Sequence, residues 1–316
     1  MQVIRGGSWC LSMLKQLYIK DGKITEIGEG EAPVWVYTAP DDAERKYLVE
    51  QLKIDEHTLS SALDPDELSR LEFEPEHAAM IFKRPKHYTA QDNFLFRVIS
   101  TGVFLFKDRV IIVRADEAPL FEGRPFIKLQ SVQDVFLKLI YRAISHFVEH
   151  LRAINLISTE LEQQINTSTE NKYLLNLFTL EKSLVYYLNA INSNGVLIEK
   201  LRSAAPRLGF SSENVEFLDD ILIENNQCHG QTEIYSQVLA SLMDARASII
   251  SNNLNLRIKA LTIITIGIML PTLIVSIFSM NVRIPLEPYY HAFWLITALA
   301  GISVAIIAIL WRKYHW

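Results

Sequence analysis

Cysteine is scarce in this sequence, which has only Cys10 and Cys228 among its 316 residues. The two cysteines form no CxxC pair and have no metal-ligand spacing, so a disulfide scaffold and a cysteine-based zinc domain are excluded. The N-terminus lacks the long apolar run of a secretory signal peptide. We therefore expect the bulk of the chain to lie in a reducing cytosol.

Common nucleotide and nucleophile motifs are missing as well. The sequence has no P-loop, no GxGxxG and no serine-histidine-aspartate neighbourhood, and Gly28-Glu29-Gly30 lacks the spacing of a dinucleotide-binding turn. Basic residues are in deficit, because the net charge is −5. An acidic chain argues against nucleic acid as the partner.

Charge is absent from two long apolar stretches near the C-terminus. Residues 260–278 form a run of 19 without a charge, and residues 292–311 form a run of 20. As a helix, each run can cross about 30 Å of hydrocarbon at about 1.5 Å per residue. We predict two transmembrane helices; two buried core helices of a soluble protein are the alternative.

The charges that remain are divided unevenly along the chain. After Leu254 the net charge is +4, so the preceding 254 residues carry −9. Arg257 and Lys259 precede the first apolar run, and Arg312 and Lys313 follow the second. By the positive-inside rule both termini are cytoplasmic, which predicts a multi-pass protein of the cell (inner) membrane with an outer loop.

The first 130 residues combine short β-rich runs with two helical stretches, 41–53 and 57–63. The Asp41-Asp42 pair before the first stretch is a helix-capping signal. Several β-rich runs end at Gly, Pro or Asp. This pattern predicts an α/β domain with helices flanking a sheet. The β-rich runs are 34–37, 79–83, 94–99, 103–106 and 110–113.

From residue 131 the hydrophobic period becomes helical. A first long helix begins there, and a second is expected near 170–201. Pro206 and Gly209 break the pattern. Ser211-Ser212, followed by acidic residues at 213 and 216, is the expected cap of a third helix that continues into the first apolar run. At about 1.5 Å per residue this third helix is about 100 Å long.

These patterns predict an α-helical membrane protein with two C-terminal transmembrane helices, an N-terminal cytosolic α/β domain and long stalk helices. The predicted parts are the α/β domain at 1–130, the helical stalk at 131–257, the first span at 258–278, the extracytoplasmic loop at 279–290, the second span at 291–311 and a basic cytosolic tail at 312–316.

Polar side chains recur along the first span at alternating intervals of three and four residues, which places them in one seam of a helix. One interpretation is helix packing, since small hydroxyl residues let helices approach and threonine hydroxyls bond back to their own backbone. The other is an ion path that several copies of the chain enclose around an axis. The seam consists of Asn255, Ile258, Thr262, Thr265, Met269, Thr272, Ser276 and Ser279.

The phase of this seam has an alternative, in which Leu261 rather than Thr262 points inward. In the first phase Met269 and Ile258 are hydrophobic constrictions between hydroxyls. Pro271 lies in mid-span and leaves one backbone carbonyl without its helical N–H partner.

The segment 252–281, NNLNLRIKALTIITIGIMLPTLIVSIFSMN, resembles the membrane signature of the CorA family of metal-ion transporters. The match includes Lys259 before the LTIIT run, the pair Pro271-Thr272, and Met280-Asn281 at the outer end. The plan of the whole chain is similar to that family too. The resemblance implies a homopentameric, funnel-shaped assembly that is not an enzyme.

The resemblance implies that divalent cations, chiefly Mg²⁺, cross the lipid bilayer through the pentameric pore, driven by the electrochemical gradient. No tightly bound cofactor is expected, since Mg²⁺ is the transported ion and, in some members, a regulator. In the family the asparagine of a Gly-Met-Asn tripeptide forms the outer selectivity ring, which here implies Asn281, beside Met280 and Ser279. A ring of amide oxygens suits outer-shell contact with a hydrated ion.

The same resemblance assigns the remaining positions of the path. Thr272 and Met269 lie in mid-span, Leu261 and Ile258 near the inner gate, and Asn255 just below it. The basic residues at the cytosolic mouth are Lys259, Arg312 and Lys313.

Two positions depart from the family pattern. Ser279 stands where the tripeptide usually has glycine, and Arg283 adds positive charge to a loop whose one acidic residue is Glu287. A transporter of Zn²⁺, Co²⁺ or Ni²⁺ in the same family, including a proton-coupled one, is therefore the alternative function.

Another class of function is suggested by His146, Glu149 and His150, which spell the inverted zinc-protease motif HxxEH. On a helix the two histidines share a face and can hold zinc. The motif lies within a long amphipathic pattern, where a pair of histidines between helices is the alternative. A tail-anchored sensor or scaffold without a pore is a third class.

Acidic residues outside the membrane part have two interpretations each. Asp64-Pro65-Asp66-Glu67, with Arg70 and Glu72, is either a Mg²⁺-sensing region, as some family members have between subunits, or a solvated helix-capping loop. On the stalk, Asp219, Asp220 and Glu224 either concentrate cations or are surface charge.

Overall fold

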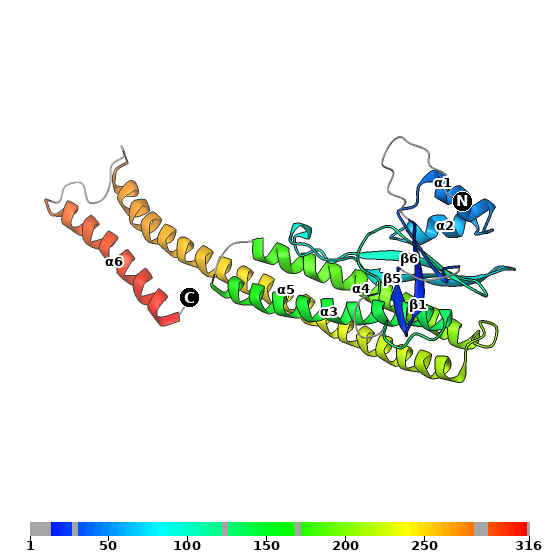
Figure 1. Ribbon diagram of the computed structural model, residues 1–316. Helices are drawn as coiled ribbons and strands as arrows, with labels where there is room; N and C mark the ends of the chain where they lie inside the picture. The colour runs from blue at the N-terminus through cyan, green and yellow to red at the C-terminus, as the bar shows by residue number, and fades with distance from the viewer. Residues whose placement is uncertain (1–13, 27–30, 122–125, 168–171, 281–289, 315–316) are drawn as a thin grey trace. The chain divides into compact units, whose positions relative to one another are not determined.

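The computed structural model describes residues 14–26, 31–121, 126–167, 172–280 and 290–314. The chain divides into two compact units, Met1–Ser241 and Leu242–Trp316. The first unit contains a mixed sheet and long helices, and the second contains the C-terminal apolar helices. The predicted combination of an N-terminal α/β domain, long helices and two C-terminal apolar helices is confirmed (Figure 1).

The sheet of the first unit has seven strands in the order β2-β1-β3-β7-β6-β5-β4. Among the strands that the structure describes, β3 and β7 are the one parallel pair. Between them in the chain come α1, α2 and the strands β4, β5 and β6. All other neighbours are antiparallel. The strands are β1 Leu14–Lys20, β2 Lys23–Thr25, β3 Val34–Thr38, β4 Arg70–Phe73, β5 Ala78–Pro85, β6 Val98–Leu105 and β7 Val110–Arg114.

One face of this sheet is covered by α1 (Asp42–Glu50) and α2 (Glu56–Leu63). Asp41, the first residue of the predicted capping pair, caps α1, since its carboxylate accepts a hydrogen bond from the Glu44 N–H at 2.8 Å. Alternate strand residues and helix residues form one buried cluster on this face, and burial of such apolar surface stabilises the domain. The cluster consists of Tyr37, Leu48, Ile54, Leu59, Ala79, Phe104, Ile111 and Val113.

The predicted strand 94–99 is wrong in its first half. Asn93 and Phe94 have positive φ angles of 47° and 65°, which turn the chain away from an extended path. The next residues lie against a helix instead, because the Phe96 N–H donates to the Ser183 hydroxyl at 3.0 Å. Strand β6 then continues through Gly102, so it joins the end of the predicted run 94–99 to the predicted run 103–106. Strands β1, β2 and β4 were not predicted.

Three long helices follow the sheet, near their predicted bounds: α3 Val132–Thr167, α4 Lys172–Ser203 and α5 Ser212–Phe278. Ser211 caps α5, since its hydroxyl accepts a hydrogen bond from the Asn214 N–H at 3.1 Å. Asn214 also donates to Asp134 at the start of α3. A buried Asn225 on α5 donates to the Ile191 carbonyl of α4 at 3.1 Å. These bonds fix the three helices against one another within the first unit.

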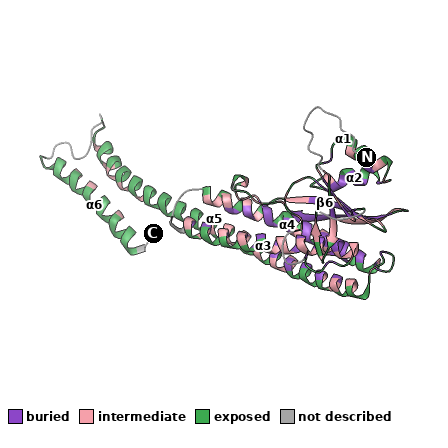
Figure 2. Ribbon diagram, in the orientation of Figure 1, coloured by how far each residue is buried: buried purple, intermediate pink, exposed green. Residues whose placement is uncertain are grey.

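The second unit begins inside α5, at Leu242, and contains α6 (Ala292–Tyr314). Both α5 and α6 contain a stretch long and apolar enough to cross a membrane, and none of that stretch is buried within the chain. Figure 2 shows these parts coloured almost entirely as exposed. Large apolar side chains without a protein cover are what a lipid-facing surface requires. The alternative of two buried core helices does not fit this exposure.

Candidate functional site

The predicted seam lies on the uncovered side of α5. The large seam residues are open, and Leu261 and Met269 are 65% and 64% exposed. The partly covered positions fall elsewhere on the helix, at Ile263, Gly267, Pro271, Ile274 and Phe278. Polar and apolar seam residues are exposed alike, namely Asn255, Ile258, Leu261, Thr262, Thr265, Met269, Thr272 and Ser276.

The threonine hydroxyls of the seam are already engaged as donors. Thr262, Thr265 and Thr272 each donate to the carbonyl oxygen four residues earlier, at 2.8, 2.8 and 2.7 Å. This is the back-bonding that the packing interpretation anticipated. A hydroxyl has one hydrogen and two lone pairs, so each threonine oxygen is left as an acceptor on the outside of the helix. The geometry therefore fits both helix packing and contact with a donor such as water.

The outer end of α5 is described as far as Met280. The Ser279 hydroxyl donates to the Ser276 carbonyl at 3.0 Å, which closes the last turn of the helix. Ser279 is not among the described residues with a positive φ angle, so its backbone conformation does not require a glycine. Asn281, Arg283 and Glu287 lie outside the described residues.

The basic residues occupy the ends of the apolar helices. Lys259 is exposed on α5, one residue before the uncharged run. Arg312 and Lys313 lie in the last turn of α6, where positive charge is favoured by the helix dipole. Their positions agree with the flanking charge that the positive-inside rule uses.

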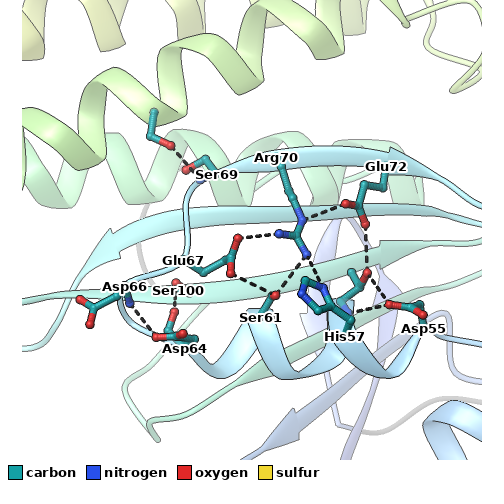
Figure 3. A network of polar contacts seen from close by, with 12 residues as sticks. Asp55, His57, Ser61, Asp64, Asp66, Glu67, Ser69, Arg70, Glu72 and Ser100 are labelled. Atoms are coloured by element: carbon teal, nitrogen blue, oxygen red, sulfur yellow. Dashed lines mark hydrogen bonds and ion pairs between the residues drawn. The ribbon is translucent and has the colours of Figure 1, made fainter.

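The acidic stretch near residue 64 is part of an ion-pair network centred on Arg70 (Figure 3). The guanidinium of Arg70 contacts Glu67 at 2.5 Å and Glu72 at 3.0 Å, and it donates to the Ser61 hydroxyl at 3.1 Å. Two carboxylates therefore share one arginine. This network joins the end of α2 to β4 and agrees with the capping-loop interpretation.

The Asp64 carboxylate of that stretch has a local partner. Asp64 accepts a hydrogen bond from the Asp66 N–H at 2.9 Å, which closes a short turn. Within the described ranges no three His, Cys, Asp or Glu residues are placed to hold a metal ion.

On the stalk, the acidic residues Asp219, Asp220 and Glu224 of α5 have different surroundings. Asp219 pairs with Arg202 of α4, with 2.6 Å between Nε and Oδ1. Asp220 and Glu224 are exposed. The geometry agrees with the surface-charge interpretation of this region.

The histidine pair of the HxxEH motif lies between helices. The rings of His146 and His150 are 4.3 Å apart on α3, and His150 Nδ1 lies 2.6 Å from the hydroxyl of Tyr187 on α4. Glu149 points elsewhere, to an ion pair with Arg142 at 2.9 Å. This arrangement fits the alternative of a histidine pair packed between helices.

Burial determines the charge state of this pair. It lowers the pKa of His146 to about 4, with Arg142 and Arg84 adding to the shift. Burial and the neighbouring His146 lower the pKa of His150 to about 3. Both rings are neutral at pH 7, as expected for histidines packed into a helix interface.

Sequence reasoning missed the buried charges of the sheet. Lys83 and Arg84 are adjacent on β5 and both are buried, because helices cover the sheet on both sides there. Arg84 donates to the Thr101 hydroxyl at 2.8 Å and pairs with Asp116. The only signal in the sequence was the pair of basic residues at the end of an apolar run. Cys228 is also buried, and burial raises the pKa of its thiol to about 12.

Known proteins are similar to this chain over nearly its full length. "Cobalt/magnesium transport protein CorA" of Methanocaldococcus jannaschii is 25% identical over 320 residues, covering 97% of this chain and 98% of that protein. The complete structure of the CorA magnesium transporter from the same organism has a TM-score of 0.76 at 20% identity, covering 95% and 96% of the two chains.

A second solved structure, of the full-length CmaX protein, has a TM-score of 0.72 at 16% identity and covers 96% of this chain and 98% of its own. These likenesses show that the fold extends over nearly the full length. The family model described as "CorA-like Mg2+ transporter protein" matches residues 30–313. This chain, with its α/β domain, long helices and two exposed apolar helices, belongs to the CorA-like Mg²⁺ transporter family.

Proposed function

We propose that this chain forms a homopentameric pore that carries divalent cations, chiefly Mg²⁺, into the cell down their electrochemical gradient. The cell (inner) membrane is the proposed location, with both termini in the cytoplasm. Family membership and the CorA relative named for cobalt and magnesium transport support this proposal. The flanking charges at Lys259, Arg312 and Lys313 support the orientation.

The exposed seam of α5 is the observation that carries the proposal. Its threonines donate their hydrogens inward to the helix and present oxygen lone pairs outward. Mg²⁺ keeps several of its waters in proteins, and the hydrogens of those waters need acceptors of this kind. A simple membrane anchor has no need of acceptors at regular intervals.

The described part of one chain has two candidate spans, which are too few to enclose a pore, so the seam of each copy must face the same axis as its neighbours. In that arrangement Thr272 and Met269 line the middle of the path, and Leu261 and Ile258 form the inner hydrophobic gate. Asn255 lies below this gate, and the hydroxyls of Ser276, Thr265 and Thr262 continue the acceptor series. Lys259, Arg312 and Lys313 surround the inner mouth and repel cations unless the mouth opens.

Asn281 is the proposed outer ring, with Met280 and Ser279 beside it. Amide oxygens accept hydrogen bonds from the ion's water and carry no charge that would trap it. Movement of a divalent cation inward gains about 4.6 kcal/mol per 100 mV, twice the value for a single charge. The membrane potential is then sufficient, and no tightly bound cofactor is needed.

The test is ion flux into liposomes that contain the purified chain. Asn281→Ala should abolish Mg²⁺ uptake while the protein still purifies as a pentamer. Asn226→Ala, an exposed asparagine far from the spans in sequence, is the matched control and should leave uptake unchanged. Full transport by the Asn281→Ala variant would overturn the role of this ring.

The choice of ion is tested in the same vesicles. Mg²⁺, Zn²⁺, Co²⁺ and Ni²⁺ are compared with and without a membrane potential and a proton gradient. Uptake of Mg²⁺ that follows the potential alone supports the proposal. Uptake of Zn²⁺ that requires the proton gradient would support the alternative from the same family, which the departures at Ser279 and Arg283 motivate.

A further inference from the structure

A cavity of about 340 Å³ lies in the first unit, between the loop after α2, the segment before β6, and α4. Its walls include the apolar side chains of Leu68, Leu95 and Val98. The volume is at the lower end of the range for pockets that bind small organic molecules. The ion path that we propose on α5 shares no residue with this cavity.

The floor of the cavity holds a buried positive charge. Lys83 is 4% exposed, and its ammonium donates to the Pro65 carbonyl at 2.6 Å and to the Ser100 hydroxyl at 3.1 Å. An ammonium has three hydrogens, so one is left to donate into the cavity that Lys83 lines. No described carboxylate lies within ion-pair distance of Lys83.

A buried cation without an ion pair is costly. Burial accordingly lowers the pKa of Lys83, while the charges of Asp66, Asp64 and Glu67 act from a distance in the opposite direction. Asp66 also lines the cavity, and Figure 3 shows its side chain pointing away from the Arg70 network. An anion seated in the cavity would supply the counter-charge that Lys83 lacks.

The lysine is held in place by α4. Strand β4 pairs with β5 only as far as Ile81, so the backbone of Lys83 has no strand neighbour on that side. The buried side chain of Asn194 takes that place, accepting from the Lys83 N–H and donating to its carbonyl, both at 2.9 Å. The floor and the α4 wall are therefore rigidly joined before any ligand binds.

The mouth of the cavity adds a second cation and an aromatic ring. Arg97 is exposed, and its guanidinium makes no ion pair with any residue that the structure describes. Tyr186 lines the α4 side and is 44% exposed, with the Lys182 ammonium 5.7 Å from its ring. Asn189 and Ser193 provide neutral polar groups on the same wall.

We infer that this cavity binds a small anion carrying a planar ring, of the nucleoside monophosphate class. The phosphate would accept from the Lys83 ammonium and the Arg97 guanidinium, both common phosphate-binding groups. The ring would lie against Tyr186 and Leu68, and the amide of Asn189 is available to a base or a ribose hydroxyl. The two cations would thus contact the anionic half of the ligand, and Tyr186 would contact its planar half.

Isothermal titration calorimetry on the full-length protein, in buffer without divalent cations, tests this site. The probes are AMP, adenosine, which lacks the anion, and inorganic phosphate, which lacks the ring. AMP should bind at least tenfold more tightly than either fragment, since a hydrogen bond to a charged group is worth roughly a factor of ten or more. Equal binding of adenosine and AMP, or no binding of AMP at millimolar concentration, would overturn the inference.

Variants separate the site from a general effect of charge. Lys83→Met keeps the length of the side chain, removes the buried charge and should weaken AMP binding roughly tenfold or more. Lys107→Met, an exposed lysine outside the cavity, is the control and should bind AMP as the unmodified protein does. A Lys83→Met variant with unchanged AMP affinity would also overturn the inference. The measurement needs no ion flux, so its outcome is independent of the proposed transport.

Discussion

The hydroxyl of Tyr187 lies 2.6 Å from Nδ1 of His150, inside the contact between α3 and α4. The His146 ring lies against His150, and Arg84, His87, Asp116, Arg142 and Glu149 supply the surrounding charges. The pair is neutral because protonation would place positive charge in a buried and already basic region.

Stability should fall as the solution becomes acidic. The pKa values of His146 and His150 in the fold are about 4 and about 3, below the ordinary value of 6.5. Between the folded pKa values and 6.5, the unfolded chain binds more protons than the folded chain. The contribution of the neutral histidines to the free energy of unfolding is therefore complete above pH 6.5 and is lost as the pH falls toward 3. The loss is at most about 1.4 kcal/mol per pH unit for each histidine.

Hydrogen exchange of the α3 and α4 amides between pH 7.5 and 5, corrected for the intrinsic exchange rate, measures this loss. His150→Gln should flatten the pH dependence, because glutamine can still bond Tyr187 but does not titrate. His229→Gln on α5 should not flatten it. Equal pH dependence in all three proteins would contradict the role of the buried pair.

Thr272 provides a test of the ion path against simple helix packing. Thr272→Val keeps the shape of the side chain and removes the outward oxygen, so ion flux should fall several-fold. Thr297→Val is the matched control, since Thr297 on α6 makes the same back-bond, to the Phe293 carbonyl at 2.8 Å. Uptake of Mg²⁺ into liposomes is the measurement, and equal fluxes in the two variants would favour the packing interpretation.

Gly102 allows α2 to lie close against β6. A Cβ atom at this position would overlap the Cβ of Ala62 on α2. Gly102→Ala should therefore destabilise the first unit by about 1–3 kcal/mol, the usual cost of overpacking. Urea unfolding of the full chain measures the loss.

Ala62→Gly should partly rescue the Gly102→Ala variant, because it removes the atom that the new methyl group meets. A double-mutant cycle then yields a favourable coupling between the two sites. Additive effects of the two substitutions would show that the close approach is not the cause.

Arg70 is expected to contribute more to stability than an ordinary surface ion pair. Arg70→Gln leaves Glu67 and Glu72 without their shared partner and should cost about 1–2 kcal/mol, less than a fully buried network because the pairs are partly exposed. Lys46→Gln breaks an exposed pair with Glu50 and should cost about 0–0.5 kcal/mol. Urea unfolding at low and high salt compares them, and equal losses would contradict this ranking.

The features that were predictable from the sequence depend on neighbouring residues. Asp41 and Ser211 cap helices through N–H groups three residues away. The two spans follow from length and the absence of charge. Each of these signals is contained within one segment of the chain.

The errors arose where distant segments meet. Residues 94–97 are apolar enough for a strand, but left-handed residues at Asn93 and Phe94 direct them onto α4, where Ser183 takes the Phe96 N–H. Strands β2 and β4 have three and four residues, and none of β1, β2 and β4 shows a strict alternation of buried and exposed side chains, because each lies toward an edge of the sheet. Pairing with a partner strand, rather than their own period, makes them strands.

The charge states at the described sites depend on tertiary packing in the same way. Lys83 ends an ordinary apolar run, and His150 belongs to a motif that suggested zinc, yet each is buried and contacts residues more than a dozen positions away. The charge state of a side chain depends on its burial and on hydrogen bonds from all of its neighbours in space. Many of these neighbours are distant in sequence, so a local sequence pattern does not reveal the charge state. Capping, period and span length were therefore readable along the chain, whereas the neutral histidines and the unpaired lysine follow from how α3 and α4 pack against the sheet.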